Sequence, residues 1–535
     1  DPFLLKDMDK AVNRILTAIK NEEKICIFSD YDADGVPGAV VLNDFFRKIG
    51  YENFIVYIPH RNLEGFGLNN GAIEEIVEQG TKLIVTIDCG IADLPQVDLA
   101  NERNLDVIVT DHHRVSESGP PPSAVAVINP NRADCTYPDK AIAGCLVSWL
   151  VMCALRTRLI EVGLLSDTSP KLGDLLDYVA LGTVADCVSL GESEANRAVV
   201  NAGLSMMAKQ ARPCWQVAFD RLIRDPRDLN ASFLAFQLAP RLNARGRLDD
   251  SMRGFEYLTA THPSIAEAAF LDLDAANTAR RAIEKQMVET AAPIASRQRL
   301  HGAPVSVVVL PDGHPGVQGI VASRLVEATG RPAIVLTEGQ SPEVLTGSMR
   351  SIPGVDAKAM LDSVEADHPG LFLRYGGHVG ACGMTLPKHA VGALEASIVG
   401  YWLAHHAEHT EGVQRWTDGA LLAEDLSIER ADELAQLGPF GRGFEEPVFE
   451  GVFEVLEARA IGRDGSHCRL RLRLDGREVS AVWFGAQPAG GPLAVTSGQW
   501  LDCLYQLTVN TFRGLEVNLI VRHGEPVTEG IEYDR

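Results

Sequence analysis

Short runs of apolar residues alternate with helix-like periodicity through the first half of the chain. Runs rich in Val and Ile predict buried strands at 24–28, 54–58, 83–87 and 106–110. A helix is predicted at 36–49, after the first strand. Apolar strands separated by helices are typical of a parallel sheet covered on both faces. The first half therefore predicts a doubly wound α/β fold.

A helical stretch follows this predicted sheet. The pattern is mostly helical from about 140 to 260, and one long helix is predicted at about 264–292. Ala276 and Met287 fall on one face of this helix. Pro293 is expected to end or kink it, because proline cannot donate the helical hydrogen bond.

Two further units are predicted beyond this helix. The first, at about 300–405, is α/β, with strands at 305–310 and 333–337, a helix at 317–329, and glycine-rich turns at Gly347 and 376–377. The second has the period of a strand, because apolar residues alternate with Arg469, Arg471 and Arg473 over 467–474, and similar alternation recurs at 515–521. Several strands broken by Gly-rich turns predict a small β-barrel at the end of the chain.

Composition excludes several classes of protein. The chain is 46% hydrophobic and 23% charged, which excludes dominant disorder. No apolar run approaches the ~20 residues of a membrane span, so a soluble, cytoplasmic protein is expected. The ten cysteines include no Cys-x-x-Cys pair, which argues against a zinc ribbon or a disulfide framework. Because the chain opens on Asp1 with no leader-like segment, we expect no signal peptide and some missing upstream residues.

The net charge of −23 argues against a basic nucleic-acid coat or scaffold. It leaves room for an enzyme that gathers carboxylates around metals and confines its arginines to one groove. The local distribution of charge therefore has to decide between these classes.

Acidic and imidazole side chains follow the ends of three predicted strands. Asp30, Asp32 and Asp34 follow the first strand, Asp88 follows another, and the run 111–113 (Asp-His-His) follows a third. Ligands collect at the carboxyl ends of strands in such a sheet, so these clusters are expected to converge. Each acid taken alone is equally well explained as a turn or helix cap.

Convergence of so many carboxylates requires cations, because their mutual repulsion in one crevice would otherwise be prohibitive. Oxygen ligands with one or two imidazoles suit Mn²⁺ or Mg²⁺. Asp186 lies at the end of another apolar segment and is a candidate to close the site.

Candidate anion-binding groups occur in two other segments. Arg241, Asn243, Arg245 and Arg247 are interleaved with small residues, which suits bidentate phosphate contacts or an ordinary solvated loop. A second set combines glycines with hydroxyl and basic side chains, which suits either an anion pocket or plain turns: Ser348, Arg350, Ser351, Gly377 and His378.

Five ordered motifs resemble those of the DHH phosphoesterase superfamily: Asp-Tyr-Asp-Ala-Asp-Gly at 30–35, Ile-Asp-Cys-Gly at 87–90, Asp-His-His at 111–113, Ile-Asn-Pro-Asn at 128–131 and Leu-Gly-Thr-Val-Ala-Asp at 181–186. Within it, the chain is similar nearly end to end to the bacterial RecJ-type single-strand-specific 5′→3′ exonucleases. Ser29 replaces a usual glycine and Pro37 a common small hydroxyl residue, although neither change removes a carboxylate.

The resemblance implies a modular α/β architecture. Its expected parts are a parallel-sheet DHH catalytic domain at 1–260, a connecting helix at 261–298, a smaller α/β DHH-associated domain at 299–408, a linker at 409–440, and an OB-fold-like nucleic-acid-binding barrel at 441–535.

The resemblance also implies a two-metal site that holds Mn²⁺ or Mg²⁺. Asp32 and Asp34 would face two neighbouring ions, Asp88 would bridge them, and Asp30 would support Asp32. His112 and Asp186 would complete the site shared with Asp34. His113 would either orient a ligand or hydrogen-bond the scissile phosphate, and Asp111 would orient the histidines.

The implied DNA contacts fall into three groups. Arg61 matches a family position near the scissile region, and the arginines at 241–247 would track the strand backbone. Ser348, Arg350, Ser351, Gly377 and His378 would capture the 5′ end. Arg469, Arg471 and Arg473 would bind DNA from the barrel, where four aromatic residues either stack on bases or fill the core: Trp483, Phe484, Tyr505 and Phe512.

The implied activity is a single-stranded-DNA-specific 5′→3′ exonuclease that releases mononucleotides in DNA recombination and repair. Single-strand-binding protein and a RecQ-type helicase are the implied protein partners, and a monomer is expected. Two alternatives are a DHH phosphodiesterase of short oligonucleotides or cyclic dinucleotides, and a non-catalytic replication scaffold. The barrel argues against the first alternative, and the intact acids and histidines argue against the second.

Overall fold

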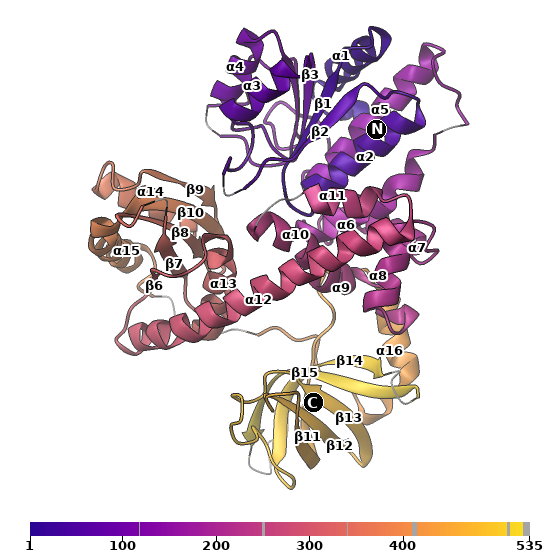
Figure 1. The fold of residues 1–535 in the computed structure, drawn as a ribbon. Helices are drawn as coiled ribbons and strands as arrows, with labels where there is room; N and C mark the ends of the chain where they lie inside the picture. The colour runs from indigo at the N-terminus through magenta and orange to yellow at the C-terminus, as the bar shows by residue number, and fades with distance from the viewer. Residues whose placement is uncertain are drawn as a thin grey trace.

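A long helix connects two sheet-centred units, and a closed barrel lies at the C-terminal end (Figure 1). The computed structural model describes residues 1–61, 63–116, 118–168, 170–248, 252–339, 341–408, 415–510 and 514–527. The side chains of residues 247 and 248 also lie outside this description. Among the described residues, no helix combines the length and apolar character needed to cross a membrane.

The first sheet is fully parallel, with strand order β2-β1-β3-β4-β5. Side chains of β1 alternate between two cores, since Ile25 and Ile27 face α1, α2 and α5, whereas Cys26 and Phe28 face α3 and α4. The predicted doubly wound sheet is confirmed. Its elements are α1 (Met8–Lys20), β1 (Ile25–Ser29), α2 (Gly35–Lys48), β2 (Phe54–Tyr57), α3 (Asn70–Glu78), β3 (Leu83–Ile87), α4 (Leu94–Glu102), β4 (Asp106–Thr110), β5 (Ala126–Ile128) and α5 (Gly144–Glu161).

A helical region packs against the same core as α2 and α5. The segment 240–247, open to interpretation as a loop, is helical, because it continues through a π-turn (Leu234–Leu238) from α9 into α10. The helices are α6 (Leu176–Ala185), α7 (Glu194–Met207), α8 (Pro213–Leu222), α9 (Ala231–Phe233), α10 (Ala239–Leu248) and α11 (Met252–Thr259).

The connecting helix α12 (Pro263–Leu300) has 38 residues, which is about 57 Å at the usual rise per residue. Pro293 does not end this helix, which continues to Leu300, so the predicted end at this residue is wrong. The proline ring is exposed, while Ala291 and Ala295 on either side are buried in the core formed with α13 and β6. Tertiary packing therefore holds the helix through the residue that lacks a donor.

The second sheet is mixed, with order β6-β7-β8-β10-β9 and only β6 and β7 parallel. Gly347 lies in β8, and Gly377 lies in β9, so the predicted turns there are wrong. The glycines permit close packing, since a Cβ on Gly347 would lie 2.3 Å from Leu336 Cδ2. The elements are β6 (Ser306–Leu310), α13 (Gln318–Thr329), β7 (Ala333–Glu338), β8 (Val344–Arg350), α14 (Ala357–Asp367), β9 (Arg374–His378), β10 (Ala381–Pro387) and α15 (Val391–His405).

The C-terminal strands close into a barrel of order β11-β12-β13-β15-β14, as predicted. Helix α16 packs against β14, and its Ala431 belongs to the barrel core. Alternation along β12 buries Cys468, Leu470 and Leu472 inside the barrel and turns the intervening arginines outward. The elements are α16 (Ile428–Ala435), β11 (Phe449–Ile461), β12 (His467–Leu474), β13 (Arg477–Trp483), β14 (Trp500–Asn510) and β15 (Glu516–Val527).

Candidate metal and nucleic-acid site

The candidate ligands follow the carboxyl ends of three adjacent parallel strands. The peptide N–H of Asp88 donates to the carbonyl of Thr110 at 3.0 Å, and that of Asp30 donates to Ile87 at 3.0 Å. These bonds continue the sheet ladder past the ends of β1 and β3. Sheet geometry therefore holds the first residue after each strand in register with its neighbours, which brings the acids together.

Three groups of side chains lie close enough to bind metal ions, with ligand atoms within 4.8 Å of one another in each group. Asp88 belongs to two of these groups, and so does His112. The groups are Asp30, Asp32 and Asp88; Asp34, His112 and Asp186; and Asp88, His112 and His113. All the predicted acidic and imidazole ligands are thus brought to one place.

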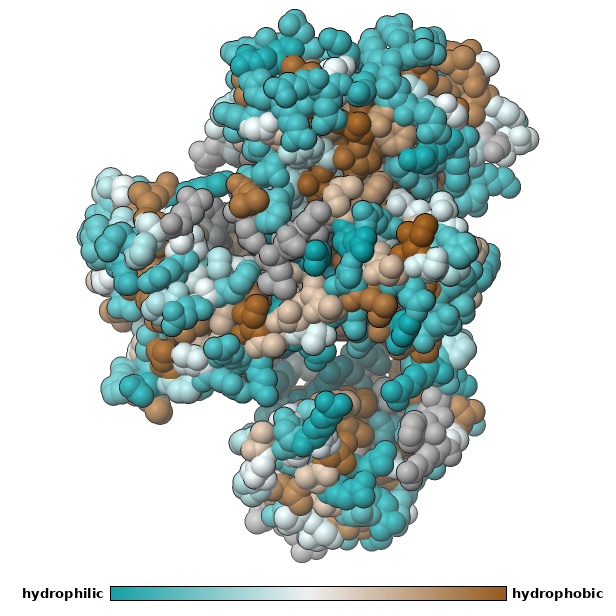
Figure 2. Space-filling view, in the orientation of Figure 1, coloured by the Kyte–Doolittle hydropathy of each residue, from teal (hydrophilic) through white to brown (hydrophobic). Residues whose placement is uncertain are grey.

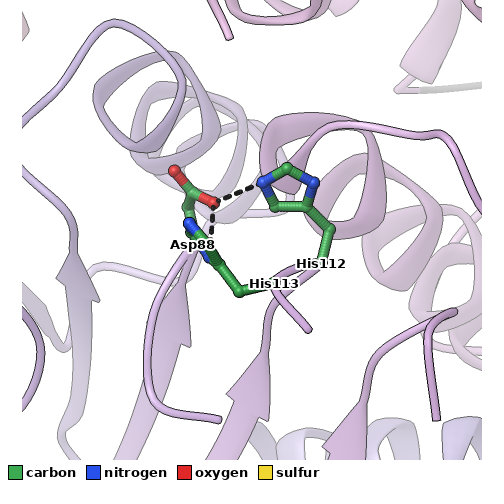
Figure 3. Close-up of side chains that lie close together, drawn as sticks. All are labelled: Asp88, His112 and His113. Atoms are coloured by element: carbon green, nitrogen blue, oxygen red, sulfur yellow. Dashed lines mark ion pairs between the residues drawn. The ribbon is translucent and has the colours of Figure 1, made fainter. Parts of the chain in front are cut away.

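His112 and His113 both approach the Asp88 carboxylate (Figure 3). His112 Nε2 lies 3.1 Å from Asp88 Oδ1 and 3.4 Å from Asp186 Oδ2. Asp88 has a left-handed backbone, with φ of 58°, and is almost fully buried. This uncommon conformation aims a buried carboxylate into the centre of the cluster.

Burial and mutual repulsion disfavour the charged form of these carboxylates. Burial raises the pKa of Asp88 well above its ordinary value, and the charges of Asp34, Asp32, Asp186 and Asp30 raise it further. Burial, followed by the charge of Asp32, likewise raises the pKa of Asp30. The pKa values of Asp34 and Asp186 are raised as well, first by burial.

The cluster fits divalent cations. Asp30 Oδ1, Asp88 Oδ1 and His112 Nε2 are buried, and no hydrogen bond reaches them within the part of the chain that the structure describes. Oxygen donors with imidazole suit Mn²⁺ or Mg²⁺. Cations would relieve both the repulsion and the unsatisfied polar atoms.

Backbone amides at the start of α5 support Asp34, a contribution that sequence reasoning missed. Gly144 N–H donates to Asp34 Oδ2 at 2.7 Å, and Cys145 N–H donates to Asp34 Oδ1 at 3.0 Å. The positive end of the helix dipole faces the carboxylate. A Cβ on Gly144 would lie 2.6 Å from Asp88 Oδ1, so only glycine fits there. The small pair 143–144 before an apolar helix was the available sequence signal.

Asp111 orients both histidines. Its Oδ1 accepts hydrogen bonds from His112 N at 2.7 Å, His113 N at 2.9 Å and His113 Nδ1 at 2.7 Å. Burial opposes protonation of His113, but the hydrogen bond to Asp111 and the charges of Asp111, Asp186 and Asp30 together outweigh it and raise the pKa of His113 to about 9. The Asn129 amide donates to the His113 carbonyl at 2.9 Å, which gives the 128–131 motif a structural role.

The Asp32 side chain caps the start of α2 and also belongs to one of the three candidate ligand groups. Its Oδ1 accepts from Asp34 N at 2.8 Å and from Gly35 N at 3.1 Å at the start of α2. Asn243 Oδ1 accepts from Ala33 N at 2.7 Å, so α10 anchors the acidic turn. The Asn243 side chain therefore positions this turn in addition to any contact with DNA.

The predicted basic residues of the first unit occupy different environments. Arg61 lies over the Tyr31 ring, 5.2 Å from its centroid, and lines a cavity of about 190 Å³ beside Asp32 and His113. Arg241 Nε bonds Asp274 Oδ1 at 2.8 Å, so its charge is partly neutralised. Arg245 is half-buried in α10, and the side chain of Arg247 lies outside the described part of the structure.

The second unit faces the carboxylate cluster across a cleft. His378 on β9 stacks with His113, with ring centroids 6.3 Å apart. A cavity of about 620 Å³ between the two units is lined by both histidines, Gly377, Phe66 and Arg374, among others. The predicted Gly-Gly-His segment therefore reaches the candidate metal site.

Arg350 is held by its own strand, β8. Its Nη1 donates to Ser348 Oγ at 2.7 Å and to the Met349 carbonyl at 2.9 Å. Burial lowers the pKa of Arg350, and the charge of Arg61 from the first unit lowers it further. The hydroxyl of Ser351 instead donates to the Val355 carbonyl at 2.7 Å. The charges of Arg61 and Arg350 therefore act on each other across the cleft, and we refer to Arg61, Ser348 and Arg350 together as the cationic group.

A basic groove runs beside α12. Its volume is about 1080 Å³, and α10, α12 and α13 contribute Arg241, Arg281, Lys285 and Arg324, while Arg463 comes from the barrel. Figure 2 shows the surface hollowed between the barrel and the rest of the molecule. Sequence reasoning missed the basic residues on α12, although 280, 281 and 285 carry three cations in two turns.

The arginines of β12 are not equivalent. Arg469 and Arg471 are exposed, whereas Arg473 pairs with Glu454 at 3.0 Å and Glu478 at 3.4 Å. Arg471 also lies 3.8 Å from Glu478. Of the barrel aromatics, Trp483 and Tyr505 are core residues, Phe484 is 59% exposed, and Phe512 lies outside the described residues.

Three family models match the chain. The DHH family N-terminal domain matches residues 24–183, the DHHA1 domain matches 302–399, and the RecJ OB domain matches 417–523. These matches correspond to the parallel sheet, the mixed sheet and the barrel.

Curated relatives match nearly the whole chain. The single-stranded-DNA-specific exonuclease RecJ of Haemophilus influenzae is 34% identical over 99% of this chain and 92% of the relative. The exonuclease of the same name from Dickeya dadantii is 36% identical over 98% of this chain and 92% of the relative.

Solved structures of RecJ are similar to this chain over nearly its whole length. RecJ of Thermus thermophilus in complex with Mn²⁺ superposes with a TM-score of 0.80 and 29% identity, over 99% of this chain and 72% of that one. The Mg²⁺ complex from the same organism has a TM-score of 0.74 and 26% identity, over 98% and 71%.

We expect metal-free protein to lose stability as pH rises above about 4, because Asp30, Asp34, Asp88 and Asp186 have raised pKa values in the folded state. Their contribution is present below the unfolded value of 3.8 and is lost as pH rises through the folded values. Mn²⁺ should remove this loss by replacing the protons.

Thermal unfolding in chelator and in Mn²⁺, at about pH 5 and about pH 8, checks this expectation. The Mn²⁺-dependent rise in Tm should be larger at the higher pH, and Asp88→Asn should reduce it, while Asp220→Asn on the exposed face of α8 should not. A rise of equal size at both pH values would contradict the assignment.

Proposed function

The chain belongs to the RecJ single-stranded-DNA-specific exonucleases of the DHH family, and on that premise we propose how its own residues cleave a strand from the 5′ end. The observation that carries the proposal is the convergence of three ligand groups, with Asp88 and His112 each shared by two of them. Solved relatives in complex with Mn²⁺ and with Mg²⁺ support the use of these ions.

Two divalent ions fit the cluster. Asp30, Asp32 and Asp88 would hold one ion, and Asp34, His112 and Asp186 would hold the other, with Asp88 between them. When bound, such ions activate water and stabilise the charge that develops on a phosphodiester. Asp34 is kept in place by the amides of α5, so the second ion would meet a preset carboxylate.

His113 is proposed to hydrogen-bond the scissile phosphate. Its Nδ1 is engaged by Asp111, and its raised pKa keeps the ring cationic at neutral pH. The Nε2 proton remains for an anionic oxygen. The ring lines the small cavity that also contains Arg61 and Asp32, which is where a phosphate beside the metal ions would lie.

The cationic group Arg61, Ser348 and Arg350 is proposed to capture the 5′ end. Residues from both sides of the cleft contribute to it, and Arg350 is held rigidly by Ser348 and its own strand. An end bound there would present its first phosphodiester to the cluster, so that mononucleotides are released in the 5′→3′ direction. Gly377 and His378 on β9, which line the cavity of about 620 Å³ beside His113, are proposed to contact the bound end as well.

The rest of the strand is proposed to follow the basic groove toward the barrel. Arg241 on α10 lines this groove together with Arg281 and Lys285 of α12, and Arg245 and Arg247 are proposed as further DNA contacts from the same helix as Arg241. Arg469 and Arg471 are the exposed cations of β12. An acidic chain that concentrates its arginines in this way can hold a polyanion despite its net charge.

The remaining inferences stay predictions. They are a cytoplasmic, monomeric protein, a role in recombination and repair, and binding to single-strand-binding protein and a RecQ-type helicase. The alternative functions gain no support from the described residues, because the full ligand set of an enzyme converges and a barrel is attached to it.

Replacing Asp88 should be the most damaging change to the metal site. Asp88→Asn removes one charge from a carboxylate shared by two ligand groups, so a loss of several kcal/mol, or about a thousandfold in rate, is expected. Single-turnover cleavage of 5′-labelled single strands at saturating Mn²⁺ measures it, with Asp220→Asn as the control. A rate near that of wild type would refute the bridging role.

Replacing Arg350 should impair recognition of the 5′ end more than binding of internal phosphates. We expect Arg350→Ala to reduce the ratio of cleavage rates for 5′-phosphorylated and 5′-blocked strands by about tenfold. This is the free energy of about one hydrogen bond to a charged group, expressed as a ratio of rates. Competition digests of the two substrates measure the ratio, with Arg103→Ala, at an exposed position at the end of α4, as the control. A wild-type ratio would show that the pocket lies elsewhere.

Replacing the exposed barrel arginines should weaken DNA binding in a salt-dependent way. Two lost phosphate contacts in an Arg469→Ala/Arg471→Ala variant should flatten the slope of log affinity against log salt by about 1.4. Arg473→Ala should have a smaller effect, because Arg473 is already paired with two glutamates. Equal effects of the two variants, measured by fluorescence anisotropy, would argue against this face.

A further inference from the structure

A short segment between α16 and the barrel returns to the first unit of the molecule. We define residues 437–444 as the return segment. It makes a tight bend, in which Gly441 N bonds the Phe444 carbonyl at 2.9 Å and Phe444 N bonds the Gly441 carbonyl at 3.0 Å. None of the metal-site or DNA-binding assignments above uses this segment.

The return segment is seated closely on the loop that follows α6. Leu190 N donates to the Arg442 carbonyl at 2.7 Å. A Cβ on Gly191 would lie 1.9 Å from the Gly443 carbonyl oxygen, so the two backbones touch. The bend therefore fits only while residue 191 has no side chain.

A second anchor lies beside the first. Arg197 Nη2 on α7 donates to the Leu437 carbonyl at 2.8 Å, and its guanidinium lies over the Phe444 ring, 4.0 Å from the centroid. Phe444 in turn packs against the core of the first unit. Backbone, cation–π and apolar contacts thus fix this segment to the catalytic unit rather than to the barrel alone.

The seating brings one arginine to the edge of the metal site. Arg442 Nη1 donates to the Cys187 carbonyl at 3.4 Å. Cys187 has a left-handed backbone, with φ of 57°, directly after Asp186, which ends α6.

We propose that Arg442 is a positioning residue for the metal site, which holds the turn at Asp186 and Cys187 so that the Asp186 carboxylate faces His112 and Asp34. This inference rests on the proposed two-metal function. Its consequence is that the strand-binding barrel and the metal site are physically coupled through the return segment. Deleting the chain from residue 440 onward would therefore remove part of the support of the metal site together with the barrel.

The test uses the full chain with Arg442→Ala, Arg442→Lys and the control Arg430→Ala, whose side chain is exposed on α16. Mn²⁺ binding without DNA is titrated by electron paramagnetic resonance, and single-strand affinity is measured separately in chelator. We expect Arg442→Ala to weaken Mn²⁺ binding about tenfold, as for other residues that orient metal ligands. Arg442→Lys should restore part of this loss, and Arg430→Ala should bind as wild type.

A second variant approaches the same contact from the catalytic side. Gly191→Ala leaves every charge in place but collides with the return segment, so it should also weaken Mn²⁺ binding without changing strand affinity in chelator. Unchanged Mn²⁺ binding in both variants would overturn the proposal. So would a loss confined to strand affinity, since Arg442 would then be a DNA contact.

The outcome also separates this inference from the two-metal function. If Asp88→Asn abolishes tight Mn²⁺ binding while Arg442→Ala does not change it, the metal site stands and the positioning role fails. If Asp88→Asn leaves Mn²⁺ binding intact, the metal site itself is misassigned.

Discussion

The structure depends on gathering mutually repelling carboxylates at the ends of adjacent parallel strands. The sheet ladder continues past β1 and β3, so Asp30 and Asp88 are held where their charges oppose one another. Such an arrangement is stable only with compensation. Backbone amides of α5 donate hydrogen bonds to Asp34, and the protonated His113 ring adds a positive charge beside the cluster. Divalent ions fit the carboxylate oxygens that have no hydrogen-bond donor among the described residues.

The second sheet and the groove beside α12 place positive charge around the carboxylate cluster, where a polyanion is proposed to bind. Arg350 lies on β8 of the second sheet, and its charge acts on that of Arg61, which follows β2 in the first unit. The basic groove continues beside α12, a helix that packing holds through Pro293. In the proposed function, the long helix sets the spacing between the metal-ligand cluster and the surfaces that would hold the strand, so a net charge of −23 is compatible with a local route for DNA.

Several residues have a structural role that is separate from their chemistry. Asn243 anchors the acidic turn, Arg241 is paired with an acid, and Arg473 is neutralised by two glutamates. Residue type together with the family resemblance predicted all three as DNA contacts. Their partners come from other elements, so only the folded chain reveals how much of each side chain remains for a ligand.

The sequence by itself determined the parallel sheet, the barrel and the positions of the metal-ligand candidates, because short apolar periodicity and the residues at strand ends are local features. It could not show that Gly347 belongs to a strand or that Pro293 lies within a helix, since long-range packing overrides local preference there. Tertiary structure alone decided the support from α5 and the approach of Arg442 to Cys187, which are 255 residues apart. Contacts of that separation depend on how whole units pack, and no local pattern of residue types encodes them.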